Sequence, residues 1–245
     1  MLKMPCEQEL KVEELSASID NHEIVREVSL TVCSGETLLI FGPNGAGKTT
    51  LLAAIAGLPR VKILRGRVRL GEEDVTSLPV HERVRRGILL SYQIPPELTG
   101  VTVASLAGLI SKRSGTQNLI PELAKMLEVE YLLDRDAFKG FSGGERKRVE
   151  VFLTMLARPK FALLDEPDSG VDIDSVKLIG NALKYMVDAF NTGLLVVTHT
   201  RLLVELIGKQ AKGVIFKNGS IACSGGALEL FGLLEEKGFE GACNG

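Results

Sequence analysis

One glycine-rich stretch, residues 42–50, constrains the fold of this chain more than any other part of its sequence. The stretch is GPNGAGKTT and fits the pattern GxxxxGK[ST]. An apolar run of strand length, residues 37–41, precedes it, and an apolar run typical of a helix, residues 50–56, follows it. A phosphate-binding P-loop requires a strand, a glycine loop and a helix in this order. The pattern therefore predicts a site for a nucleoside triphosphate.

The chemistry of phosphate binding accounts for the residue types in this loop. Glycine has no Cβ, so backbone N–H groups can close around phosphate oxygens at the positive end of the helix dipole. We expect Lys48 to reach the β- and γ-phosphates and the Thr49 hydroxyl to bind Mg²⁺. A chance glycine turn is the alternative, and the flanking strand and helix argue against it. The residues expected to bind nucleotide here are Gly42, Pro43, Asn44, Gly45, Ala46, Gly47, Lys48, Thr49 and Thr50.

Composition excludes several other classes of protein. With 245 residues and 45% hydrophobic content, the chain can bury the core of a large α/β domain. The balance of 29 basic against 31 acidic residues argues against a general nucleic-acid-binding surface. No apolar run approaches the ~18 residues of a membrane helix, and the first residues lack the apolar core of a signal peptide. We therefore expect a cytoplasmic protein without direct membrane insertion.

The four cysteines lie far apart in the sequence, and no two of them form a CxxC pair. Scattered cysteines in a cytosolic protein are expected to be reduced. We therefore expect free thiols, and neither a metal ion nor a cluster held by this chain alone. The cysteines are Cys6, Cys33, Cys223 and Cys243.

Two kinds of hydrophobic pattern divide the chain. Period-two alternation between residues 10 and 33 indicates an antiparallel layer that leads into the P-loop strand. Helical spacing without a strand run fills residues 97–158, and alternation of strands and helices returns at Phe161. The sequence predicts a single α/β P-loop NTPase domain with an antiparallel β layer and an inserted helical subdomain. We expect the core at residues 1–93 and 160–245 and the helical subdomain at residues 94–159.

Two carboxylates end the buried strand that begins at Phe161. At the carboxyl end of such a strand, Asp165 is expected to hold Mg²⁺ directly or through water. Glu166 is expected to orient or deprotonate the attacking water. The alternative is that the two carboxylates only cap the strand, and the P-loop upstream favours the catalytic interpretation.

A Ser-Gly-Gly sequence, residues 142–144, opens a long helix and forms a second candidate anion site. The N-terminus of a helix attracts phosphate by the same physics as the P-loop. Because one phosphate pocket already exists, a second one indicates contact with the nucleotide of another molecule. An ordinary helix N-cap is the alternative, and Ser-Gly-Gly-Glu read alone favours that alternative.

The order of the motifs resembles that of the ABC-type ATPases. GPNGAGKTT, Gln93 after a strand, the signature FSGGE, ALLDEP and His199 follow one another as in that family, over nearly the whole chain. The resemblance implies the cofactors ATP and Mg²⁺ and an ATP-dependent head-to-tail dimer. Each ATP would then lie between the P-loop of one subunit and the signature of the other.

The same resemblance implies roles for individual residues. Gln93 would sense Mg²⁺ and couple the site to the helical subdomain, and His199 would bind the γ-phosphate and help Glu166 hold the water. Asp172 matches a loop that crosses the dimer interface. The signature residues are Ser142, Gly143, Gly144 and Glu145, of which Ser142 and Gly144 would contact the γ-phosphate. The expected metal ligands are Thr49, Gln93 and Asp165.

Two departures from the common ABC pattern refine the resemblance. Ile19 stands where many ABC ATPases have an aromatic residue that stacks on adenine, so we expect weak base selectivity. The signature FSGGE with the basic run at residues 146–148, and the sequence LDEPDSGVDID at residues 164–174, resemble the SufC family of ATPases for iron–sulfur cluster assembly. Val149 differs from the polar residue that is common in that family.

The resemblance implies that ATP hydrolysis drives a conformational change in a SufB/SufD-like scaffold. The scaffold would dock on the helical subdomain and the Gln93 loop. The alternative is the nucleotide-binding subunit of an ABC membrane transporter, with the same ATP chemistry. A non-catalytic, nucleotide-gated module is disfavoured because the expected catalytic residues are present. Without nucleotide we expect a monomer, since the two polar faces need ATP to bridge them.

Overall fold

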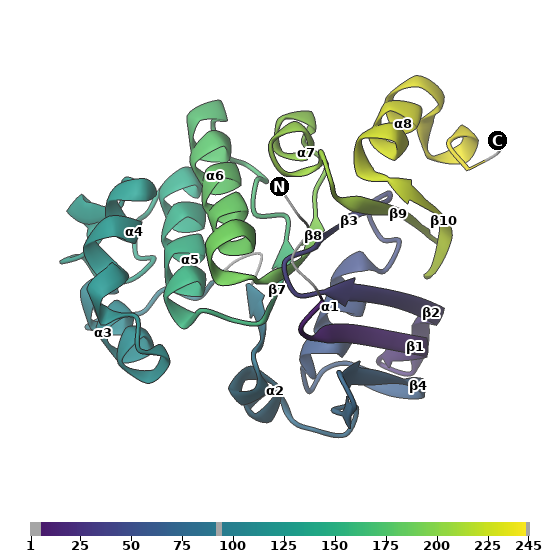
Figure 1. The fold of residues 1–245 in the computed structure, drawn as a ribbon, viewed down its shortest axis with the longest axis horizontal. Coiled ribbons are helices and arrows are strands. Elements are labelled where there is room, and N and C mark those ends of the chain that lie inside the picture. The colour runs from purple at the N-terminus through teal and green to yellow at the C-terminus, as the bar shows by residue number, and fades with distance from the viewer. Residues whose placement is uncertain (1–5, 92–94, 244–245) are drawn as a thin grey trace.

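The computed structural model describes residues 6–91 and 95–243 (Figure 1). Its strands form two sheets, one of four strands in the order β2-β1-β4-β5 and one of six in the order β10-β9-β3-β8-β7-β6. The smaller, antiparallel sheet contains β1 (Glu9–Ile19), β2 (His22–Cys33), β4 (Lys62–Leu70) and β5 (Glu73–Asp74). The larger sheet contains β3 (Thr37–Phe41), β6 (Ile88–Ser91), β7 (Phe161–Asp165), β8 (Gly193–Val197), β9 (Lys212–Lys217) and β10 (Ser220–Gly226).

The larger sheet is parallel except at one edge. Strands β6, β7, β8, β3 and β9 pair in parallel, and β10 returns antiparallel to β9. The turn between β9 and β10 contains Asn218 and Gly219, both with positive φ, as the Asn-Gly hairpin signal requires. Every residue of β7 and β8 is buried, because helices or the second sheet cover both faces.

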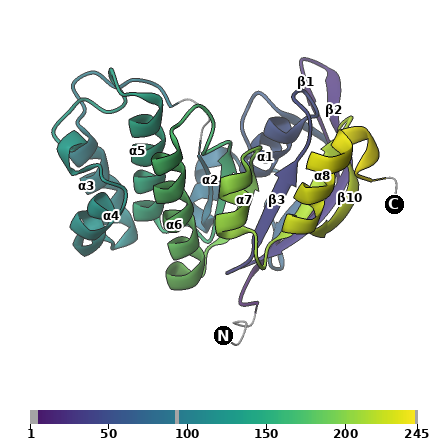
Figure 2. The same cartoon turned by 90° about the horizontal axis from the view of Figure 1, so that it is seen from above.

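Helices cover this sheet on both sides (Figures 1 and 2). The α-helices are α1 (Lys48–Ala56), α2 (Val80–Arg86), α3 (Val103–Ser114), α4 (Ile120–Met126), α5 (Gly143–Ala157), α6 (Ile173–Phe190), α7 (Arg201–Ile207) and α8 (Ala227–Gly241). Two short 3₁₀ helices are η1 (Gln117–Leu119) and η2 (Glu130–Leu132). The predicted α/β fold with an antiparallel layer and a helical insertion is confirmed. The boundaries proposed for the subdomain stay a prediction.

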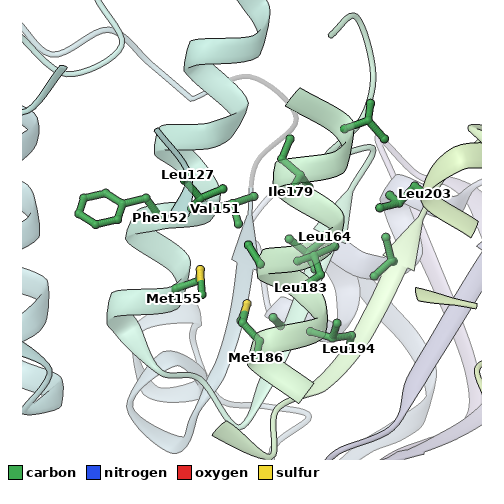
Figure 3. Close-up of a cluster of buried hydrophobic side chains, with 14 of the residues drawn as sticks. Leu127, Val151, Phe152, Met155, Leu164, Ile179, Leu183, Met186, Leu194 and Leu203 are labelled. Atoms are coloured by element: carbon green, nitrogen blue, oxygen red, sulfur yellow. The ribbon is translucent and has the colours of Figure 1, made fainter. Parts of the chain in front are cut away.

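Successive side chains of the central strands point to opposite faces of the sheet and contribute to two separate hydrophobic cores. In β7, Ala162 and Leu164 pack toward α5, α6 and α7, whereas Phe161 and Leu163 pack toward α1 and the antiparallel sheet. Figure 3 shows the first core, where Leu183 of α6 lies beside Leu164 and Leu194 of the sheet. The strand alternation therefore joins the P-loop helix and the helical segment to opposite faces of one sheet.

A buried arginine fixes the far end of the P-loop helix. Arg83 of α2 is 2% exposed, and its guanidinium donates hydrogen bonds to four backbone carbonyls. Two of these carbonyls belong to the last turn of α1, where carbonyls lack intrahelical partners and a cation is favourable. Burial lowers the pKa of Arg83 to about 10, so it stays charged at neutral pH. The four acceptors are the carbonyls of Ala54, Ile55, Thr76 and Leu78.

The expectation of four free thiols is wrong. Cys6 forms a disulfide with Cys33, and Cys223 forms one with Cys243. The partners are 27 and 20 residues apart in sequence, and sheet register is what brings the first pair together. Glu9 pairs with Cys33 across β1 and β2, so the chain just before β1 runs beside the end of β2. The spacing of the cysteines in the sequence does not predict which of them pair.

Reduction of the two bridges should destabilise the protein. Chain-entropy arguments assign about 3 kcal/mol to a disulfide that closes a loop of ~15 residues, and slightly more to longer loops. We expect urea unfolding, followed by circular dichroism, to shift to lower denaturant when dithiothreitol is added. A variant with all four cysteines changed to serine is the control and should not respond to the reductant. Maleimide labelling of all four cysteines in unreduced, denatured protein would contradict the bridges.

Candidate functional site

The glycine loop joins the buried end of β3 to the start of α1. Gly42 approaches the strand β9 so closely that a Cβ on it would lie 2.2 Å from the carbonyl oxygen of Phe216. Gly47 precedes α1 with φ of 104°, a conformation that side chains disfavour, and it provides no side-chain cap. The first N–H groups of α1 have no intrahelical partners and point where an anion would sit.

The lysine of the loop lies within it. Lys48 is 5% exposed, and its Nζ donates to the carbonyl oxygens of Gly42, at 2.7 Å, and Pro43, at 2.9 Å. Burial lowers the pKa of Lys48, and the nearby carboxylates of Glu166 and Asp165 act in the opposite direction. The ammonium and the two predicted carboxylates therefore share one electrostatic environment, although they come from distant parts of the sequence.

The donor set around Asp165 fits Mg²⁺. Asp165 ends β7 and is 5% exposed, and within the described residues its Oδ1 has no hydrogen-bond partner. Burial raises the pKa of Asp165, and the neighbouring Thr49 side chain acts in the opposite direction. A buried carboxylate oxygen without a partner beside a hydroxyl is the oxygen-rich chemistry that Mg²⁺ selects. In the part of the chain that the structure describes, no group of three or more His, Cys, Asp or Glu could hold a metal ion.

The strands β7 and β8 bring Glu166 and His199 together. The Nε2 atom of His199 lies 3.5 Å from Oε1 of Glu166. Burial, followed by the charge of Lys48, lowers the pKa of His199, so the neutral imidazole prevails at pH 7. A carboxylate and a neutral imidazole at this separation can together orient a water molecule.

A buried hydrogen bond connects the turn after β7 to the segment after β8. Sequence reasoning missed this bond. The Thr198 hydroxyl donates to Oδ2 of Asp168 and accepts from the backbone N–H of Thr200. Thr198 is fully buried, and Asp168 is 5% exposed. The bond connects the turn after β7 to the segment that carries His199. A hydroxyl residue at the end of a buried strand was the only sequence signal for it.

A cavity of about 630 Å³ opens over the P-loop. Ile19 lies in its wall, where the comparison with ABC ATPases expected the adenine contact. The wall also contains His22, which sequence reasoning did not single out. The other lining residues are Asp20, Ile24, Asn44, Gly45, Ala46, Gly47, Lys48, Thr49, Thr50 and Glu166. The signature residues 142–145 are not among the lining residues, so the structure does not bring them to the P-loop of the same chain.

The signature residues form the N-terminus of α5. Ser142 Oγ accepts a hydrogen bond from the N–H of Glu145, and the Glu145 carboxylate accepts one from the N–H of Ser142, so the two residues make a capping box. The two glycines permit close packing, since a Cβ on Gly143 would lie 2.7 Å from the carbonyl oxygen of Gly170. Gly144 faces the start of α6 in the same way. The ordinary N-cap interpretation therefore describes the local structure correctly.

Asp172 caps the next long helix. Its carboxylate accepts hydrogen bonds from the backbone N–H and the hydroxyl of Ser175, at 2.8 and 2.9 Å. A Cβ on Gly144 would lie 3.0 Å from Oδ2 of Asp172, so the starts of α5 and α6 are in contact. The signature and the predicted interface loop therefore form one continuous surface.

A buried ion pair within α5 is hydrogen-bonded to the end of β6, and sequence reasoning missed this connection as well. Lys147 and Glu150 are 5% and 7% exposed, and Nζ lies 3.5 Å from Oε2. Ser91, the last residue of β6, donates a hydrogen bond to Oε1 of Glu150 at 2.7 Å. The signature helix is thus attached to the strand that leads to Gln93. Gln93 itself lies outside the described residues.

Comparisons with known proteins agree with one another. A family model described as "ABC transporter" matches residues 25–169. A probable ABC transporter ATP-binding protein of Streptococcus pyogenes is 37% identical over 243 residues, which are 95% of this chain and 94% of that protein. A probable ATP-dependent transporter, ycf16, of Cyanophora paradoxa is 34% identical over 94% of this chain and 93% of its own length.

Solved structures of ATP-binding cassettes are also similar to this chain. The ADP conformation of MJ1267, an ATP-binding cassette of an ABC transporter, superposes with a TM-score of 0.78 at 25% identity, covering 97% of this chain and 99% of that one. A nucleotide-free ATP-binding cassette from an ABC transporter superposes with a TM-score of 0.75 at 26% identity, covering 89% and 91%. Among the residues that the structure describes, no helix has the length and apolar character needed to cross a bilayer. The chain belongs to the ABC family of ATPases.

Proposed function

We propose that this chain hydrolyses MgATP at the P-loop cavity and uses the reaction to drive a conformational change in a SufB/SufD-like scaffold during iron–sulfur cluster assembly. One observation carries the catalytic part of the proposal. Lys48, the unsatisfied oxygen of Asp165, and the Glu166–His199 pair meet at one edge of the sheet. Phosphoryl transfer needs a cation on the phosphates, a metal ligand and a group that positions water.

The residues have distinct roles in this reaction. The loop N–H groups and Lys48 bind and orient the phosphates, while Thr49 and Asp165 would hold Mg²⁺, which neutralises charge on the phosphate oxygens. Glu166 accepts a proton from the attacking water or orients it, and His199 supports both Glu166 and the γ-phosphate. Gln93 would complete the metal site and couple it to the helical segment.

Substitution of the proposed base separates binding from hydrolysis. Glu166→Gln removes the negative charge and keeps the shape, so we expect kcat to fall by roughly a hundredfold or more. ATP binding, measured with a fluorescent analogue, should persist. Glu205→Gln on α7 is the control and should keep the parental rate, because Glu205 only pairs with Arg201 on the surface. Full activity of the Glu166→Gln protein would refute the assignment of the base.

The metal assignment predicts a change in magnesium dependence. Asp165→Asn removes the charge of the proposed ligand, and we expect the Mg²⁺ concentration for half-maximal ATPase rate to rise about tenfold or more. The exposed Asp174 provides the matched variant Asp174→Asn, which should leave the magnesium titration unchanged. An unchanged titration in the Asp165→Asn protein would exclude this carboxylate from the metal site.

The proposed working unit is an ATP-dependent head-to-tail dimer. The signature lies away from the P-loop cavity of its own chain, and its Ser-Gly-Gly backbone can accept a phosphate only from another molecule. A structure with the same fold, the cassette MJ0796 at 20% identity and a TM-score of 0.75, is described as a dimeric post-hydrolysis state bound to ADP and Pi. Ser142, Gly143, Gly144, Glu145 and Asp172 would contribute to this interface.

The proposed partner follows from sequence features rather than from the ATP site. The signature with Glu145, the basic residues after it, and the sequence of residues 164–174 support a SufC-type ATPase. An ABC transporter subunit is the second candidate, and the names of relatives such as the Streptococcus pyogenes protein favour it. Both candidates use the same ATP chemistry, so only the partner distinguishes them.

Affinity capture from native extract should identify the partner class. Tagged Glu166→Gln protein with MgATP would be incubated with soluble and detergent-solubilised membrane fractions, and the Lys48→Ala protein is the control for ATP-dependent capture. We expect a soluble, cysteine-containing partner that stimulates the ATPase rate of the parental protein. A polytopic membrane protein as the captured partner would reject the Suf proposal in favour of the transporter.

A further inference from the structure

The carboxylate of Glu145 is held from two sides. Its Oε2 accepts the N–H of Ser142 at 2.8 Å, within the capping box of α5. Its Oε1 accepts the hydroxyl of Tyr131 at 2.9 Å, and Tyr131 belongs to η2. The two ends of one carboxylate are therefore fixed by two different elements of the helical segment.

The element that carries Tyr131 is itself tied to α5. Arg148 donates from Nη1 to the carbonyl oxygens of Leu127, at 3.0 Å, and Glu128, at 2.8 Å. Its Nη2 donates to the Tyr131 hydroxyl at 3.3 Å. The Arg148 side chain is 12% exposed. These bonds hold the segment before η2 against α5, one turn after the signature, and so fix the position of the tyrosine.

The ionisation states agree with this geometry. The hydrogen bond from the Ser142 backbone holds the pKa of Glu145 below its usual value, so the carboxylate is charged at neutral pH. Burial and the bond to Glu145 raise the pKa of Tyr131, so its hydroxyl keeps its proton and remains the donor. The bond is thus a charge-assisted one, which is stronger than a bond between neutral groups.

A negative charge at this place matters for a second subunit. The same helix N-terminus that attracts a phosphate also carries the Glu145 carboxylate, and like charges close together near a protein surface repel each other. The location of this charge, and not only its presence, decides how much it opposes an incoming phosphate.

We propose that Tyr131 is a positioning residue for the signature, whose hydroxyl holds the Glu145 carboxylate away from the phosphate that a partner subunit presents to residues 142–144. The proposal rests on the proposed function of the signature in binding ATP across the dimer interface. Tyr131 does not contact the nucleotide in this arrangement, and it acts only through Glu145.

The test uses a one-atom change. Tyr131→Phe removes the hydroxyl and keeps the ring, at a residue that is 59% exposed. In a Glu166→Gln background, light scattering would follow dimer formation as ATP is added, and we expect the half-maximal ATP concentration to rise at least fivefold. Binding of ADP to the monomer, measured by calorimetry, should not change, because the P-loop cavity does not include this residue.

The chain offers a matched control and a charge test. Tyr185 makes the same type of bond, from its hydroxyl to Oε1 of Glu122 at 3.3 Å, and Tyr185→Phe should leave dimer formation at the parental ATP concentration. When Glu145→Gln is also present, Tyr131→Phe should change the half-maximal ATP concentration by less than twofold, since no negative charge remains to be restrained.

Three results would overturn the proposal. One is a Tyr131→Phe protein that dimerises like the Tyr185→Phe control. Another is an equal effect of Tyr131→Phe with and without the Glu145→Gln substitution, because the tyrosine would then act on something other than the carboxylate charge. A parental protein that does not dimerise with ATP would reject the proposed role of the signature, and this inference with it. Thermal melting of each variant checks that the fold is retained.

Discussion

The parallel pairing of β7, β8 and β3 is the constraint on which the whole site depends. Ile40 and Asp165 both pair with Val197, so three strands end at the same level of the sheet. The chain leaves these ends as the glycine loop, the Asp165–Glu166 sequence and the segment that carries His199. Parallel strands can meet in this way only through long crossovers, which explains why the side chains of the candidate site come from distant parts of the sequence.

Local signals made the centre of the site predictable from sequence. An apolar run that ends in a polar residue marks the carboxyl end of a buried strand, and this pattern predicted Asp165 and Glu166 as site residues, whereas the role of His199 was implied by the resemblance to ABC ATPases. The glycine loop was predictable for the same reason, because its whole motif lies within residues 42–50. Features that depend on partners far along the chain were not predictable, because sheet register or helix packing creates them. The disulfides, the Asp168–Thr198 bond and the Ser91–Glu150 bond are of this kind.

The role of Arg83 was also invisible in the sequence. It is one of three arginines within four positions, and only the packing of α2 against α1 shows which of them is buried. The same holds for Tyr131, an isolated aromatic residue before the signature whose hydroxyl partner is fourteen positions away. Side chains that serve as connectors carry no periodic pattern, so hydrophobic spacing does not reveal them.

The bonds of Arg83 also determine how the P-loop helix can move. Two of the four bonds end on carbonyls in the last turn of α1, and two end on the segment before α2. The guanidinium therefore connects α1 to this segment. A displacement of α1 along its axis would stretch or break these hydrogen bonds unless α2 moved with it. Arg83 therefore couples the position of the P-loop helix to that of α2.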